Sequence, residues 1–161
     1  MDSQIFTLFH VIISLVGILS GVIVAYGLVT DRTMPVLTAI FLVTTIATSV
    51  AGFFFHRDHI LPSHILAIIS LLLLVPATYA AYLQNLRRSW RGVYIVGAVA
   101  SLYFNVFVLI IQSFQKIPLL HALAPTGSTE PAFAASQGAA LLLFIVIGVV
   151  AFRRFRPAIF S

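Results

Sequence analysis

The sequence contains no cysteine and very few charged residues. The absence of cysteine excludes disulfide bonds, thiolate metal sites, iron–sulfur clusters and covalently attached c-type haem. Only 8% of the residues are charged and 61% are hydrophobic, whereas a soluble domain carries roughly 25% charged residues. Together with a mean hydropathy of +1.12, this composition argues against a soluble domain and indicates an integral membrane protein.

Acidic residues are fewer than basic ones: the chain has four against nine, and none of the four falls inside a long apolar run. Without a carboxylate at membrane depth, a proton or sodium relay of the transporter type is not expected. The sequence also has no phosphate-binding glycine loop and no Ser–His–Asp order. These absences leave no recognisable catalytic constellation.

Five apolar runs are each close to the roughly 20 residues that an α-helix needs to cross a bilayer. They are too long for the strands of a membrane β-barrel and do not alternate between apolar and polar positions. The runs cover residues 5–29, 35–55, 62–83, 92–114 and 133–152. We therefore expect an all-α integral membrane protein, a single bundle of five transmembrane helices with a long loop over residues 115–132.

The basic residues are distributed unevenly between the two sides that this topology defines. The side opposite the N-terminus receives Arg32, Arg87, Arg88, Arg91, Arg153, Arg154 and Arg156. The N-terminal side receives only Arg57 and Lys116. The positive-inside rule then predicts that the N-terminus lies outside and the C-terminus in the cytoplasm. Together with the small size and the high hydropathy, this bias leads us to expect a bacterial inner-membrane protein. The net charge of +5 is accounted for by this topology and by contact with the lipid bilayer, so no nucleic-acid partner is expected.

The five histidines all fall on the N-terminal side, at the ends of different apolar runs or in the loop 115–132. They are His10, His56, His59, His64 and His121. Polar residues at the membrane boundary are costly and are often functional. This one-sided distribution is the only feature of the sequence that suggests chemistry, and it predicts a haem or metal site near the outer face.

Two of the histidines end stripes of small residues at helical spacing. The first run carries His10, Ser14, Gly17 and Gly21 on one face, and the second carries Thr45, Ser49, Gly52 and His56. Close helix packing is the first interpretation of such stripes, because small residues let membrane helices approach one another. Asn105 lies near the centre of the fourth run. It needs a hydrogen-bond partner there, because a polar amide is costly to bury in a membrane without one.

A b-type haem is the alternative interpretation of these stripes. His10 and either His56 or His64 would be its axial ligands, as helical bundles hold cofactors between facing helices. Gly17, Gly21 and Gly52 would leave room for the flat ring. With a quinone as partner, such a protein would transfer electrons.

A copper or zinc ion is the second model, and the cluster around residue 58 favours it. His56, His59 and His64, with Asp58, supply enough nitrogen and oxygen ligands for one ion. A protein with this site would bind or deliver the metal at the outer face.

A third possibility requires no cofactor. Small hydrophobic chains without catalytic residues often pack against a larger membrane complex as accessory subunits, and the 14 phenylalanines and long outer loop of this chain suit that role. A homo-oligomer is possible on the same grounds. These three functions remain open at the level of the sequence.

Overall fold

The structure is a computed structural model that describes residues 3–54 and 62–157. Within these ranges it contains the helices α1 (Ser3–Val29), α2 (Pro35–Gly52), α3 (Pro62–Tyr82), α4 (Trp90–Lys116), α5 (Pro118–Leu123) and α6 (Pro131–Arg154). In this described part of the chain, five helices, all except α5, are long and apolar enough to cross a membrane. The predicted all-α bundle is confirmed, and the helices indicate a multi-pass membrane protein.

Prolines determine where several helices begin. Pro35, Pro118 and Pro131 each stand in the first turn of a helix, where a missing backbone N–H removes no helical hydrogen bond. Because Pro118 starts α5, the expected loop 115–132 is divided into short connections on either side of a small helix. Helix α2 ends at Gly52 rather than at the expected residue 55, which lies outside the described residues.

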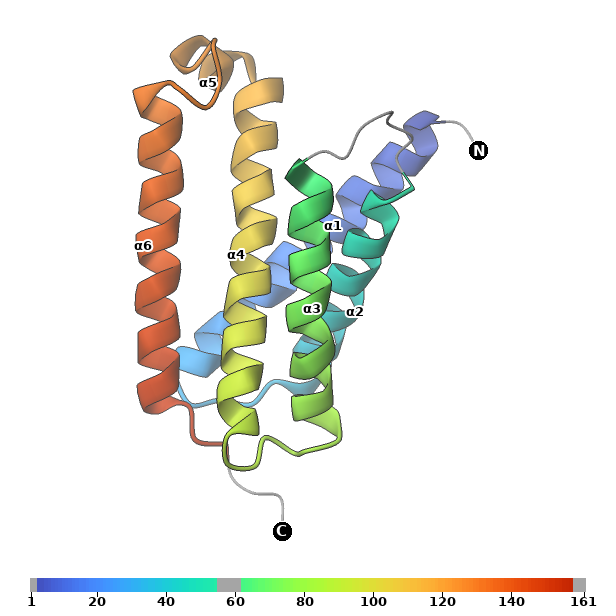
Figure 1. The fold of residues 1–161 in the computed structure, drawn as a ribbon, viewed down its shortest axis with the longest axis vertical. Coiled ribbons are helices and arrows are strands. Elements are labelled where there is room, and N and C mark those ends of the chain that lie inside the picture. Colours follow the sequence, from blue (N-terminus) through green and yellow to red (C-terminus); the bar gives the residue numbers. More distant parts are fainter. Residues whose placement is uncertain (1–2, 55–61, 158–161) are drawn as a thin grey trace.

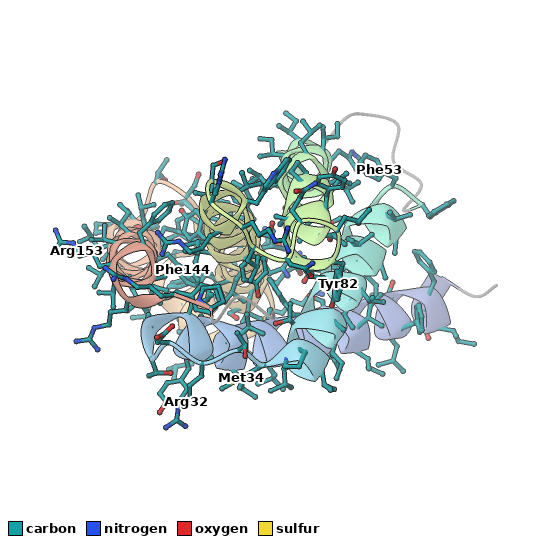
Figure 2. All side chains as sticks on the ribbon, turned by 90° about the horizontal axis from the view of Figure 1, so that it is seen from below. Arg32, Met34, Phe53, Tyr82, Phe144 and Arg153 are labelled. Atoms are coloured by element: carbon teal, nitrogen blue, oxygen red, sulfur yellow. The ribbon has the colours of Figure 1, made fainter. Side chains whose placement is uncertain are left out.

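The bundle has two chemically different ends. We call the end with the N-terminus, the start of α3 and the short helix α5 the histidine end, and the opposite end, with the α1–α2 and α3–α4 loops and residues 155–157, the arginine end (Figure 1). Figure 2 looks along the bundle from the arginine end, where Arg32 and Arg153 point outward.

Helix α4 is the central element, since it packs against α1, α2, α3, α5 and α6. Helix α1 crosses behind the others at a steep angle (Figure 1). Its C-terminal end lies near the foot of α6, whereas its N-terminal end lies beyond α2 and α3. Contact between α1 and the pair α4–α6 is therefore concentrated at the arginine end.

The hydrophobic core follows this arrangement. Its buried members are Val24, Ala25, Leu28, Phe41, Leu42, Leu74, Ala77, Ala80, Tyr94, Ile95, Ala98, Val99, Leu102, Phe144, Ala151 and Phe155. Every helical member stands in the arginine-end half of its helix. In the other half, the described residues 4–16 of α1, 103–113 of α4 and 131–143 of α6 include no buried side chain. Thr48, Ser49, Ser70 and Phe114 are buried in the histidine-end halves of their helices, so the histidine end is packed, but more loosely than the arginine end.

Candidate functional site

The histidines in the described ranges lie at one end of the bundle on three different helices. His10 is half-buried on α1, and His121 is exposed on α5. His64, in the first turn of α3, stacks its ring on Phe53, with the ring centroids 5.8 Å apart and the planes inclined by 12°. Helices α1 and α3 both pack against α2.

The predicted metal ligands lie largely outside the described residues. His56, Asp58 and His59 fall in the segment 55–61, and only His64 of the proposed set is described. Among residues 3–54 and 62–157, no group of three potential ligands is close enough to hold a metal ion. The metal site therefore stays a prediction.

The glycines of the predicted haem site differ in how much space surrounds them. A Cβ atom at Gly17 would lie 3.1 Å from Thr44 Oγ1 and 3.3 Å from Thr45 Oγ1. At Gly21 it would lie 2.6 Å from Leu102 Cδ1. Gly17 thus packs against Thr45 of the second stripe, whereas Gly21 packs against Phe41 and Leu102. Side chains fill the space that a ring would need beside both glycines. Only Gly52 has no described atom within 4 Å of its added Cβ.

Polar side chains link α4 to its neighbours near the middle of the bundle. Asn105 donates from Nδ2 to Thr45 Oγ1 on α2 at 3.4 Å, which supplies the partner that the sequence requires. Gln137 on α6 donates from Nε2 to the Phe107 carbonyl at 3.1 Å. The Gln137 Oε1 atom is buried and accepts no hydrogen bond from the described residues. One polar acceptor therefore stays unsatisfied on the inner side of α6.

Helix α6 is the least enclosed of the membrane-spanning helices. In its most apolar 18-residue stretch, 6% of the residues are buried, against 22–39% in the other four. Its histidine-end half exposes Ala134, Ala135, Gly138 and Ala139. A Cβ atom at Gly138 would have nothing within 4 Å among the described residues, so this face is open. We call these four residues the small-residue face of α6.

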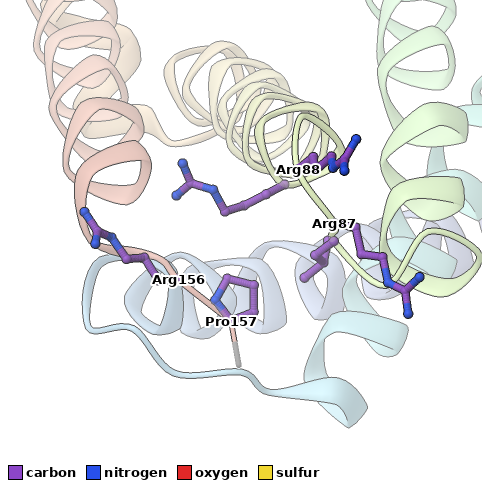
Figure 3. A pocket seen from close by; sticks show the side chains of 6 residues that line it. Arg87, Arg88, Arg156 and Pro157 are labelled. Atoms are coloured by element: carbon purple, nitrogen blue, oxygen red, sulfur yellow. The ribbon is translucent and has the colours of Figure 1, made fainter. Parts of the chain in front are cut away.

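The arginine end contains a pocket of about 490 Å³. It is lined by Leu86, Arg87, Arg88, Arg91, Arg156 and Pro157, which come from the α3–α4 loop, the first turn of α4 and the segment after α6 (Figure 3). We call it the arginine pocket. Guanidinium groups prefer phosphate and carboxylate oxygens, so the pocket suits an anionic group.

An apolar groove of about 540 Å³ runs between α4 and α6 on the membrane side of this pocket. Val99 and Tyr103 of α4 face Phe144 and Gly148 of α6 across it. Phe144 lies between the two helices in Figure 2. The only charged side chain in its lining is Arg153, at the arginine end.

No family model, curated protein or solved structure matches this chain. Any assignment of function therefore rests on the geometry described above.

The sequence analysis did not identify the small-residue face or the arginine pocket. The first could have been noticed, because Ala134 and Gly138 are four residues apart in an apolar run, as in known membrane-helix contact motifs. The second could not, because Arg91 and Arg156 are distant in the sequence and come together only when α4 packs against α6.

Proposed function

We propose that this chain is a non-catalytic accessory subunit of a larger membrane complex, and that the small-residue face of α6 binds a transmembrane helix of another subunit. The observation that carries this proposal is the exposure of that face. Lipid tails do not require small residues, whereas close contact between membrane helices does.

Two glycines on other membrane helices support this interpretation. At Gly21 and Gly97, neighbouring helices approach so closely that an added Cβ atom would lie 2.5–2.8 Å from its nearest neighbours. Glycine is used at these positions for helix contact. Gly138 lies in a similar sequence setting but has no helix against it within the described residues, which fits a helix supplied by a partner.

Cysteine cross-linking in native membranes tests the proposal, and the cysteine-free chain provides a clean background. We expect Gly138→Cys to cross-link to one defined membrane protein. The control is Leu72→Cys on α3, which is 69% exposed and is expected to face lipid. We also expect Ala135→Leu combined with Gly138→Leu to release the chain from its complex in mild detergent, while Leu72→Phe leaves the complex intact.

Two results would contradict the accessory role. If the wild-type chain migrates alone after gentle solubilisation, it does not belong to a larger complex. Cross-links from Gly138→Cys only to a second copy of the same chain would identify a homo-oligomer in place of a larger complex.

A second candidate is the histidine-lined site for haem b or for a copper or zinc ion, with electron transfer to a quinone in the haem case. It is favoured by the looser packing of the histidine end and by the buried hydroxyl groups there. Thr48 and Ser49 are buried on α2, and Thr48 Oγ1 has no hydrogen-bond partner in the described ranges. A cofactor at this end would sit beside Gly52, with His10 and His64 as the described candidate ligands.

Oxidised and dithionite-reduced absorption spectra, with elemental analysis of the same sample, test this second candidate. Haem ligation predicts a Soret band that shifts on reduction and disappears in His10→Ala or His64→Ala. An ion site predicts stoichiometric copper or zinc that is lost when His56 and His59 are changed together. A featureless spectrum without bound metal would rule out both forms.

We further propose that the protein resides in a bacterial inner membrane with the arginine end in the cytoplasm. The seven arginines at that end support this orientation through the positive-inside rule.

A further inference from the structure

The arginine pocket gathers positive charge from three separate segments of the chain. Four of the seven arginines at this end line one hollow of about 490 Å³. Asp31 is the only acidic residue that the sequence places at this end, and its Oδ1 accepts a hydrogen bond from the Arg156 backbone N–H at 2.7 Å. This end of the bundle therefore carries seven arginines and one carboxylate, and the four arginines of the pocket give it a positive charge.

Backbone hydrogen bonds hold the arginines of the α3–α4 loop in place. The Leu86 N–H donates to the Ala80 carbonyl at 3.0 Å, and the Arg87 N–H donates to the Gln84 carbonyl at 3.0 Å. Leu86 and Arg88 have φ angles of 56° and 48°, in the left-handed region that such residues seldom adopt. The turn therefore presents Arg87 and Arg88 from a defined backbone rather than from an extended tail (Figure 3).

The segment after α6 forms the opposite wall of the pocket. Arg91, in the first turn of α4, holds α4 to this wall. Its guanidinium donates to the carbonyls of Phe152, at 3.1 Å, and Phe155. Phe152 and Arg153 line the arginine end of the apolar groove, and Ile95, one helical turn from Arg91, lines its other side. The positive pocket and the apolar groove thus meet at Arg91.

Aromatic residues mark the level of the lipid headgroups at this end. Trp90 packs against Tyr79 with their ring centroids 5.0 Å apart, and Tyr26 and Tyr82 are about half-exposed at the same end. Tryptophan and tyrosine collect at the membrane–water interface. Because Trp90 immediately precedes Arg91, we expect the arginine pocket to lie at the depth of the phosphate headgroups.

We propose that the arginine pocket and the α4–α6 groove together bind one anionic phospholipid, with its phosphate on the arginines and an acyl chain in the groove. A charged head next to an apolar channel matches the two halves of a phospholipid. A soluble phosphate would use only the pocket and would leave the groove without a role. This site lies at the opposite end of α6 from the small-residue face, so it does not depend on the proposed accessory role.

Trp90 is the only tryptophan and stands beside the pocket, so it reports directly on bound lipid. We would reconstitute the full chain in phosphatidylcholine containing brominated phosphatidylglycerol, and measure quenching of Trp90 fluorescence. Brominated phosphatidylcholine in the same proportion is the reference. We expect stronger quenching by the brominated anionic lipid, and no change in that preference when inorganic phosphate is added.

Matched variants separate the pocket from general surface charge. Arg87→Gln with Arg88→Gln removes two charges from the pocket, and we expect about thirtyfold weaker binding of the anionic lipid, the effect of two basic residues at a membrane surface. Arg32→Gln with Arg154→Gln removes the same charge from this end but leaves the pocket lining intact. We expect this control to retain the preference.

A third variant tests the groove without changing the charge. Gly148→Leu places a side chain into the groove, where an added Cβ atom would lie 3.8 Å from Val99 Cγ1 and would not clash. We expect it to weaken binding of the anionic lipid. The proposal is overturned if both double variants weaken binding equally, if inorganic phosphate abolishes the lipid preference, or if Gly148→Leu binds the lipid as the wild type does.

Discussion

At the scale of single residues, the space around each glycine shows whether it lies at a helix–helix contact or on an open surface. Gly97 on α4 faces α3 so closely that an added Cβ atom would lie 2.5 Å from Ala77 Cβ and 2.7 Å from the Leu73 carbonyl oxygen. Gly138 on α6 has no described atom within 4 Å of the same added atom. Two glycines in similar apolar sequences therefore have different structural roles.

We expect Gly97→Ala to destabilise the isolated protein by about 1–3 kcal/mol, the usual cost of forcing a methyl group into a packed interior. The α3 backbone carbonyl cannot move aside without displacing the helix. Gly138→Ala is the matched control and should leave the stability unchanged or raise it, because alanine favours a helix by about 1 kcal/mol over glycine. Thermal unfolding in detergent measures both changes, and equal stabilities for the two variants would contradict the packing at Gly97.

At the scale of helices, α6 is attached to the bundle by a few specific contacts. Gln137 bonds to α4 near the histidine end, and Arg91 bonds to carbonyls at the C-terminal end of α6. Phe152 stands in the last turn of α6 and Phe155 directly follows the helix, where carbonyls lack a helical partner, so Arg91 caps α6 from a different helix. Between these points, Phe144 and Ala151 are the only buried residues that α6 contributes in the part of the chain that is described.

Replacing Arg91 by glutamine should loosen the C-terminal turn of α6. We expect a local cost of about 2 kcal/mol, since hydrogen bonds from charged donors contribute more than neutral ones. Hydrogen–deuterium exchange of residues 150–156 in nanodiscs should accelerate in this variant. Arg154→Gln removes the same charge from an exposed position and should leave the exchange unchanged; equal acceleration in both variants would rule out the capping role of Arg91.

The helices could be predicted from the sequence because the thickness of the bilayer fixes the length of an apolar run. Their packing was predictable only in part. The stripe of small residues containing Gly17 predicted a helix-packing face, and Gly17 does lie against Thr44 and Thr45. Asn105 indicated a polar partner, which is Thr45. The arginine pocket was not predictable, because the hydrogen bond from Arg91 to Phe155 joins residues 64 positions apart. For the predicted haem or metal site, the sequence places the histidines at one end of the bundle. This grouping does not determine which histidines would act as ligands or whether they would bind haem or a metal ion.

At the scale of the whole molecule, the two ends differ in charge as well as in packing. We expect the arginine end to face the cytoplasm, because translocation of seven arginines across the membrane is disfavoured. Single cysteines introduced at Ser128, between α5 and α6, and at Ser89, just before α4, would report the orientation.

A membrane-impermeant maleimide added to intact cells or spheroplasts should label Ser128→Cys and should reach Ser89→Cys only after the membrane is opened. The cysteine-free wild type provides the blank. Labelling of Ser89→Cys in intact cells, with Ser128→Cys protected, would establish the reverse orientation.

The two ends of the bundle lie in opposite leaflets when the chain spans a bilayer, and they differ in how closely their helices pack. At the arginine end the helices pack closely except along the α4–α6 groove, whereas at the histidine end the inner faces of α1, α4 and α6 stay accessible. A chain alone in a flat bilayer would admit acyl chains between its helices more widely in the leaflet of the histidine end, and the lateral pressures on its two halves would be unequal. A helix or cofactor at the histidine end would remove this imbalance. The mechanical stress of the surrounding bilayer would then itself favour assembly.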